Sequence, residues 1–156
     1  MSEASAGSPV PLIEWLLPDV RPDARLALAA IARDEHPTAG TYLMRAGRPT
    51  LELGIIAEGR LAVRDTIGVD DVTLMTLEPG DVFGWSAVLD GISTASIVAL
   101  EGARVLLFER TELLQAMDAD QTLAVALYRR LLEAVAMRLD ATRLLMRDVY
   151  GGGVAT

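Results

Sequence analysis

The sequence predicts a mainly β domain with flanking helices, in which an antiparallel β-sandwich or barrel is followed by a long C-terminal helix. Three observations support this fold class. Between residues 41 and 110, apolar residues occur in short runs that glycine or proline interrupts, as in LGIIAEGRLAVRD. No long helical pattern separates these runs, which argues against a parallel α/β sheet. From Thr111 to Tyr150 the apolar pattern is helical without a break.

The segment before the predicted strands has the pattern of two short helices. It extends from Pro11 to Glu35 with a break around Pro18 to Pro22, and Asp23 is placed to cap the second helix. Within the strand region, the sequence from Gly68 to Asp71 predicts a hairpin turn. The run from Val105 to Phe108 is apolar at every position, which predicts a strand covered on both faces.

The long helix is predicted to begin between Asp118 and Gln121 and to end at Gly151 to Gly153. Apolar residues recur along it at alternating spacings of three and four, in an a/d register: Val125, Tyr128, Leu132, Val135, Leu139, Thr142, Met146 and Val149. A second stripe lies beside the first, through Leu123, Leu127, Leu131 and Ala134. One stripe can face the β-body and the other a partner helix, which predicts a homodimer; the alternative is a helix packed only on its own domain. The Thr142 hydroxyl either sets the register of the seam or touches a ligand.

Composition limits the function further. The chain has 156 residues, 51% of them hydrophobic, enough for one domain with a full core. Its 22 acidic and 14 basic residues give a net charge of −8, which argues against nucleic-acid binding. The absence of cysteine excludes disulfides, zinc–thiolate sites and a cysteine nucleophile. Residues 1–8 have the composition of a disordered leader rather than a secretory signal, and no apolar stretch is long enough to span a membrane. We expect a cytoplasmic protein.

The order of these elements, together with particular glycines, resembles the cyclic-nucleotide-binding domain of the catabolite activator and fumarate-nitrate regulator family. The resemblance covers the chain from about Leu26 to Val149. It rests on these matching segments: Gly40-Thr41, Arg45-Ala46-Gly47, Ile55 to Gly59, Pro79 to Gly84, Ala87-Val88-Leu89, Ala95-Ser96 and Val105 to Phe108. It implies one domain over residues 9–150, with a β-roll of jelly-roll type at about 37–110, C-terminal helices at about 111–149 that dimerise, and a flexible tail at 151–156.

Members of this family that bind cyclic nucleotides use a phosphate-binding cassette, roughly Phe-Gly-Glu-Leu-Ala-Leu followed by Arg-Ala. The glutamate accepts a hydrogen bond from the ribose and the arginine pairs with the phosphate. In this chain Trp85 stands at the glutamate position, and Thr94 (or Ala95) stands at the arginine position. Losing two charge-assisted hydrogen bonds weakens binding by roughly 10²- to 10⁴-fold. The resemblance therefore implies a degenerate ligand site, made of Phe83, Gly84, Trp85, Ser86, Ala87, Thr94, Ala95, Ser96 and Thr142.

What remains in this cassette supports two interpretations. Backbone amides after Gly84 and the hydroxyls of Ser86, Ser93, Thr94 and Ser96 can hold a neutral polar ligand or a weakly bound anion. Alternatively, these hydroxyls only cap a turn. Thr142 matches a threonine that contacts the base in the family, which keeps cyclic nucleotide binding by a non-standard cassette open.

Catalysis and DNA binding find little support. The single histidine, His36, is too few for the metal sites of jelly-roll enzymes, and neither a Gly-x-Ser-x-Gly nor a phosphate-binding Gly-Lys-Ser/Thr motif occurs. We expect no enzyme activity, no catalytic residue and no metal site. The family's DNA-binding domain would follow the helix, and no such sequence follows Gly151. The sequence thus predicts a stand-alone regulatory or sensor module. It binds a small polar ligand other than a cyclic nucleotide, signals through a protein partner, or is a ligand-free interaction module.

Overall fold

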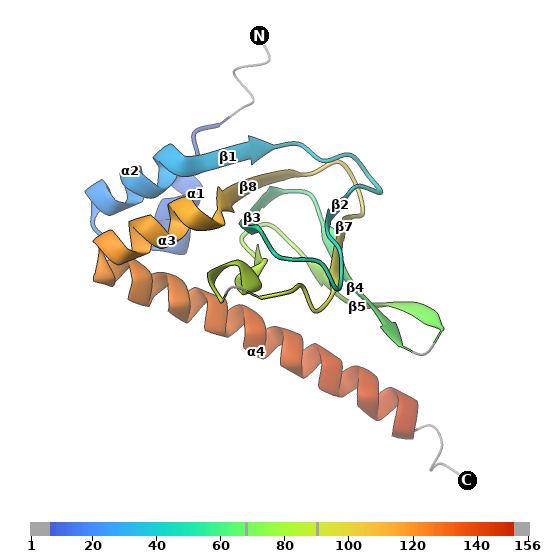
Figure 1. Ribbon diagram of the computed structural model, residues 1–156. Coiled ribbons are helices and arrows are strands. Elements are labelled where there is room, and N and C mark those ends of the chain that lie inside the picture. Colours follow the sequence, from blue (N-terminus) through green and yellow to red (C-terminus); the bar gives the residue numbers. More distant parts are fainter. Residues whose placement is uncertain (1–6, 68, 90, 152–156) are drawn as a thin grey trace.

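The computed structural model describes residues 7–67, 69–89 and 91–151 (Figure 1). Two short helices, α1 (Val10–Leu16) and α2 (Pro22–Ile31), precede the β-roll, and α3 (Arg110–Ala119) and α4 (Gln121–Gly151) follow it. Eight strands form two four-stranded antiparallel sheets. The predicted fold class is confirmed: antiparallel β-sheets with flanking helices and a long C-terminal helix.

The first sheet lies against the helices. Its strand order is β1-β8-β3-β6, with β1 at Ala32–Glu35, β8 at Arg104–Glu109, β3 at Glu52–Glu58 and β6 at Val82–Phe83. The second sheet has the order β2-β7-β4-β5, with β2 at Tyr42–Met44, β7 at Ser96–Ala99, β4 at Leu61–Ile67 and β5 at Asp70–Leu77. A 3₁₀ helix, η2 (Trp85–Val88), follows β6.

Alternating residues of β8 belong to two different cores. Val105 and Leu107 pack inside the roll with apolar residues of both sheets. Leu106 and Phe108 point the other way, into a cluster that α1, α2, α3 and α4 share. Because side chains alternate along a strand, a strand buried on both faces must be apolar at every position. The prediction that the Val105–Phe108 strand is covered on both faces is confirmed.

Three local predictions differ from the structure. The second helix ends at Ile31 rather than at Glu35, because residues 32–35 pair as β1 with β8. Asp23 lies in the first turn of α2, and Arg21 occupies the N-cap position, since Pro22 starts the helix. Asp70 and Asp71 are the first residues of β5, opposite Ile67 and Thr66, rather than part of the turn. The predicted leader lies outside the described residues up to residue 6, and so does the tail after Gly151.

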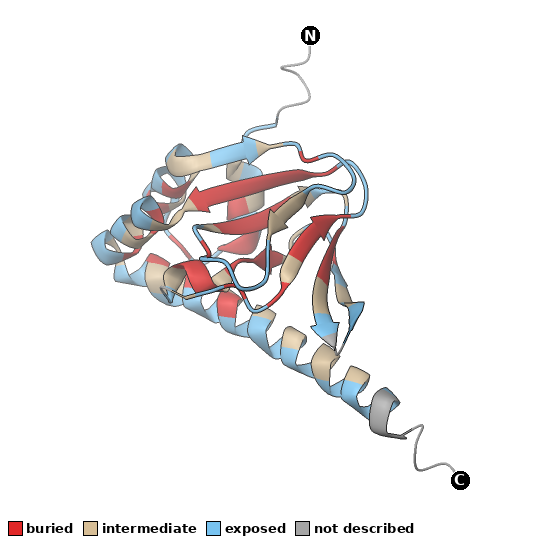
Figure 2. Ribbon diagram, turned by 45° about the vertical axis from the view of Figure 1, so that its right-hand side comes forward, coloured by how far each residue is buried: buried red, intermediate tan, exposed pale blue. Residues whose placement is uncertain are grey.

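The long helix α4 starts where it was predicted and packs along the body through one face. The Asp120 carboxylate accepts hydrogen bonds from the backbone N–H groups of Thr122 and Leu123 and so caps the helix. The second predicted stripe packs on the body: Leu123, Leu127 and Leu131 are at most 4% exposed. Figure 2 shows the buried side of α4 toward the β-roll and the exposed side toward solvent. No helix in the described part of the chain is long and apolar enough to cross a membrane.

Replacing Gly54 with alanine tests the packing of Phe83. A Cβ at Gly54 would lie 2.1 Å from the Phe83 ring, which is buried between the sheets. Overpacking at such a site typically costs about 1–3 kcal/mol, so we expect Gly54→Ala to lower the free energy of unfolding by that amount in urea denaturation. Gly102→Ala is the matched control, because a Cβ there meets no atom within 4 Å. Equal stability of the two variants would contradict the packing described.

Candidate functional site

The cassette between β6 and β7 is built around one glycine. Gly84 has φ 80°, and a Cβ there would lie 2.4 Å from the Glu52 carbonyl oxygen. Only glycine adopts this backbone conformation at this distance from β3 without strain. The chain therefore turns directly from β6 into η2, which places Trp85 and Ser86 at the rim of the roll.

A cavity of about 40 Å³ opens between this cassette, the roll and α4. Its inner wall is apolar: Met44, Val63, Met75, Leu77 and Ile97. The polar part of its lining includes Asp81, which directly precedes β6, and Ser86, Ser93 and Thr94 from the cassette. The helix α4 closes the third side with Ala134, Met137 and Arg138. An occupant of the cavity thus contacts the cassette and the helix together.

Arg138 of α4 contacts both Trp85 and Thr94 of the cassette. Its guanidinium carbon lies 5.2 Å from the centroid of the Trp85 ring, within the range of a cation–π contact. Its Nη2 donates a hydrogen bond of 3.2 Å to the Thr94 hydroxyl. The side chain is half-buried, and this burial lowers the pKa of the Arg138 guanidinium from its ordinary value, against the field of Asp65, which raises it. Arginine nevertheless remains charged at every physiological pH.

Further hydrogen bonds fix the cassette to the body. The Arg110 side chain, at the start of α3, donates to the Ala87 carbonyl oxygen at 2.7 Å. The Thr50 and Ser93 hydroxyls form a buried hydrogen bond of 2.6 Å. Because α3 leads directly into α4, the cassette is connected to the long helix both by Arg110 and by Arg138.

The structure brings together most of the residues that the sequence assigned to the site. Phe83, Gly84, Trp85, Ser86, Thr94 and Ala95 all line the cavity. Three others do not. Ala87 is a fully buried residue of η2, and the Ser96 hydroxyl accepts a hydrogen bond from the Ala46 N–H. Thr142 donates its hydroxyl to the Arg138 carbonyl oxygen one turn earlier on the same helix, so it supports α4 locally.

Arg138 itself was missed by sequence reasoning, although a signal for it exists. The cassette motif places its arginine at Thr94 or Ala95, within the loop. On α4, however, Arg138 lies four residues after Ala134 and seven after Leu131, which places it on the helix face that packs on the body. A charged residue within a buried stripe marks a polar site on the opposing surface.

The a/d stripe of α4 lies on the outer side of the helix. Six of its members are exposed: Val125, Tyr128, Leu132, Val135, Leu139 and Met146, by 37% to 69%. Thr142 is partly buried, and the side chain of Val149 lies outside the described residues. The two predicted stripes therefore exist on separate faces, with one of them against the body.

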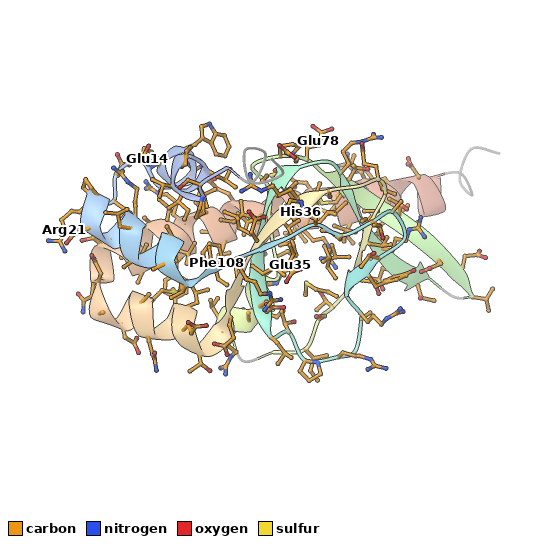
Figure 3. The ribbon with its side chains drawn as sticks, turned by 90° about the horizontal axis from the view of Figure 1, so that it is seen from above. Glu14, Arg21, Glu35, His36, Glu78 and Phe108 are labelled. Carbon is orange, nitrogen blue, oxygen red and sulfur yellow. The ribbon has the colours of Figure 1, made fainter. Side chains whose placement is uncertain are left out.

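His36 is far from this cavity. It follows β1 on the side of the roll away from α4, as Figures 1 and 3 show. Its Nε2 lies 3.5 Å from an Asp34 carboxylate oxygen that also pairs with Arg104. In the part of the chain that the structure describes, no group of three or more His, Cys, Asp or Glu side chains is arranged to hold a metal ion.

Comparison with known proteins identifies the family that has this architecture. The family model described as "Cyclic nucleotide-binding domain" matches residues 35–120, which span β2 to β8, the cassette and α3. The chain belongs to the cyclic nucleotide-binding domain family. A search of curated proteins gives no match.

Solved structures of this family share the fold at low sequence identity. A cyclic nucleotide-binding domain from Methylobacillus flagellatus KT is 19% identical with a TM-score of 0.78, covering 91% of this chain and 86% of that one. The catabolite activator protein of Thermus thermophilus is 25% identical, with a TM-score of 0.68 over 86% of this chain and 62% of its own. A regulatory subunit of a cAMP-independent protein kinase A from Trypanosoma brucei, in a mutant form bound to cAMP, is 20% identical with a TM-score of 0.61. That match covers 66% of this chain and 39% of the kinase subunit. The chain thus spans less than two thirds of the latter two proteins.

Removing Arg138 is expected to uncover the Trp85 indole. In a Trp15→Phe background, which leaves Trp85 as the single tryptophan, Arg138→Ala should increase the quenching of tryptophan fluorescence by acrylamide. The physical reason is that the guanidinium covers one face of the ring. Arg143→Ala is the matched control, because it removes the same charge from an exposed position on the same helix. Identical quenching in both variants would contradict the contact.

Proposed function

We propose that this domain is a regulatory sensor that binds a small ligand other than a cyclic nucleotide between the cassette and α4. One observation carries the proposal: Arg138 of α4 contacts both Trp85 and Thr94, the two cassette positions that differ from nucleotide-binding relatives. A ligand that enters the cavity has to rearrange these contacts or use them. Either way, its binding energy acts on the position of α4.

Two features count against an ordinary cyclic nucleotide. A cavity of about 40 Å³ has room for about three water molecules, and the Trp85 ring stands at the position of the ribose acceptor. The family's arginine is replaced by Thr94, whose hydroxyl is already bonded to Arg138. Membership of the family favours the alternative, cyclic AMP or cyclic GMP bound by a non-standard cassette, and the same experiment decides between them.

Calorimetric titration with cyclic AMP and cyclic GMP tests the proposal. We expect no binding at micromolar concentrations by the native chain, and gain of binding by roughly 10²- to 10⁴-fold in Trp85→Glu/Thr94→Arg, because two charge-assisted hydrogen bonds are restored. The design has a parallel in the Trypanosoma brucei relative, whose cAMP-bound form carries a threonine-to-arginine substitution. Trp85→Gln/Thr94→Gln is the control, because it removes the indole without adding the carboxylate or the guanidinium. Micromolar binding by the native chain would overturn our proposal in favour of the cyclic nucleotide.

The output of the sensor is proposed to be a homodimer formed through α4. The six exposed a/d residues lie on one face of the helix, away from the leucine stripe that packs on the body. An exposed apolar stripe in a regular a/d register is typical of a helix that pairs with a copy of itself. A separate protein partner is the alternative occupant of this face.

Charge placed in the a/d stripe should separate the protomers. Leu132→Glu puts a carboxylate at a seam position that is 69% exposed in the single chain, and we expect it to weaken dimerisation about a hundredfold or more, because two buried leucines are lost. Leu144→Glu is the matched control, since Leu144 is 59% exposed but lies off the seam. Sedimentation equilibrium measures both. A monomeric native chain, or equal association of the two variants, would exclude the α4 homodimer.

A further inference from the structure

Among the residues that the structure describes, the Arg138 guanidinium has no ion-pair partner. Its one hydrogen bond within the described residues goes to the neutral Thr94 hydroxyl, and no carboxylate there lies within the 4.0 Å of an ion pair. Asp65 is the acidic residue whose field reaches it, from outside that distance. A guanidinium has five N–H donors in a planar fork that fits a carboxylate or phosphate. Most of these donors are therefore available at the rim of the cavity.

Partial burial makes this unpaired charge costly. A charge removed from water is stabilised when an opposite charge binds beside it, and the attraction is larger at a half-buried site than at the surface. The Ser86, Ser93 and Thr94 side chains that line the cavity are neutral, and the carboxylate of Asp81, which also belongs to the lining, accepts a hydrogen bond from the Glu78 N–H. The site consequently favours a ligand that carries one negative group.

The interior of the cavity favours an apolar group rather than a charged one. Val63, Leu77 and Ile97 form a buried aliphatic wall, Met44 and Met75 are partly buried, and Met137 of α4 lines the cavity with about half of its side chain exposed. Methionine side chains adapt to ligands of different shape because they are unbranched and flexible. This wall suits a hydrocarbon chain better than a ribose, whose hydroxyls would lose hydrogen bonds with water.

We propose that the ligand of this domain is a short-chain aliphatic carboxylate, with its carboxylate on Arg138 and its chain in the methionine-lined interior. The proposal rests on the proposed function, since it names the ligand class of the same cavity. The volume of about 40 Å³ limits the chain to a few carbon atoms beyond the carboxylate. Arg138 is then the residue that determines specificity, and it acts from α4 rather than from the cassette.

The experiment is a titration of the full chain in the Trp15→Phe background, with Trp85 fluorescence and calorimetry as readouts. The probes are acetate, butyrate and hexanoate, with 1-butanol, 1-hexanol and butylamine as neutral and cationic counterparts. We expect saturable binding of the acids, with affinity rising roughly fourfold for each added methylene until the cavity is filled. The alcohols should bind more weakly than acids of equal length, and the amine should not bind.

Variants at Arg138 separate an ion pair from simple apolar binding. Arg138→Met keeps the length of the side chain and should weaken butyrate binding about 10- to 100-fold. Arg138→Lys should recover part of that loss, because it restores the charge without the planar fork. Arg143→Met, which removes an exposed arginine one helical turn away, should leave the affinity unchanged.

The outcomes distinguish failure of this inference from failure of the proposed function. Alcohols that bind as tightly as the acids, or an Arg138→Met variant with native affinity, would overturn the carboxylate assignment and leave a ligand site for neutral apolar molecules. Absence of binding by every probe would overturn the carboxylate assignment. If, in addition, the native chain bound cyclic nucleotides at micromolar concentrations, the proposed function would fail as well.

Discussion

The packing of one leucine stripe of α4 on the body determines which residues of the helix face the cassette and which face solvent. Leu123, Leu127 and Leu131 are almost completely buried, and each contributes about 1.5–3 kcal/mol by its removal from water. A helix is rigid over these turns, so burial of the stripe fixes its rotation about its own axis. That rotation carries Arg138 to the cassette and turns Leu132 toward solvent. The proposed ligand-binding face and the proposed dimer face are therefore two consequences of one packing arrangement.

Much of this arrangement could be predicted from sequence because it follows from periodicity. The continuous apolar run of β8 and the two stripes of α4 follow from the side-chain repeat of a strand and of a helix. Both lie where the sequence predicts them. Local elements with weak patterns were less predictable. Residues 32–35 continue the polar and apolar mixture of α2, and they form a strand only because β8 offers a free edge for pairing. Tertiary pairing overrides local propensity in such short segments.

The candidate site was predictable in its backbone but not in its chemistry. Glycine at position 84 is required by the left-handed conformation and the close approach to Glu52, so the frame can be found from the sequence. The charge in the site comes from a residue 44 positions after Thr94 in the chain. A motif confined to one loop cannot show this, because the contact depends on how α4 crosses the cassette. Likewise, Thr142 matched a family pattern, yet its hydroxyl is used within its own helix.

The same contacts explain how a small occupant can have a large effect. Arg138 is the single basic residue in the cavity wall, and it is bonded on one side to the cassette and fixed on the other to a 31-residue helix. Displacement of its guanidinium from the Thr94 hydroxyl needs either a change of side-chain rotamer or a movement of the helix. Leu131, two turns earlier, resists rotation because it would leave the core. The C-terminal half of α4, where burial is only partial, is free to respond, and that half carries Leu139 and Met146 of the outer stripe. Under the proposed function, ligand binding at the cassette and association along α4 are thereby linked through one side chain.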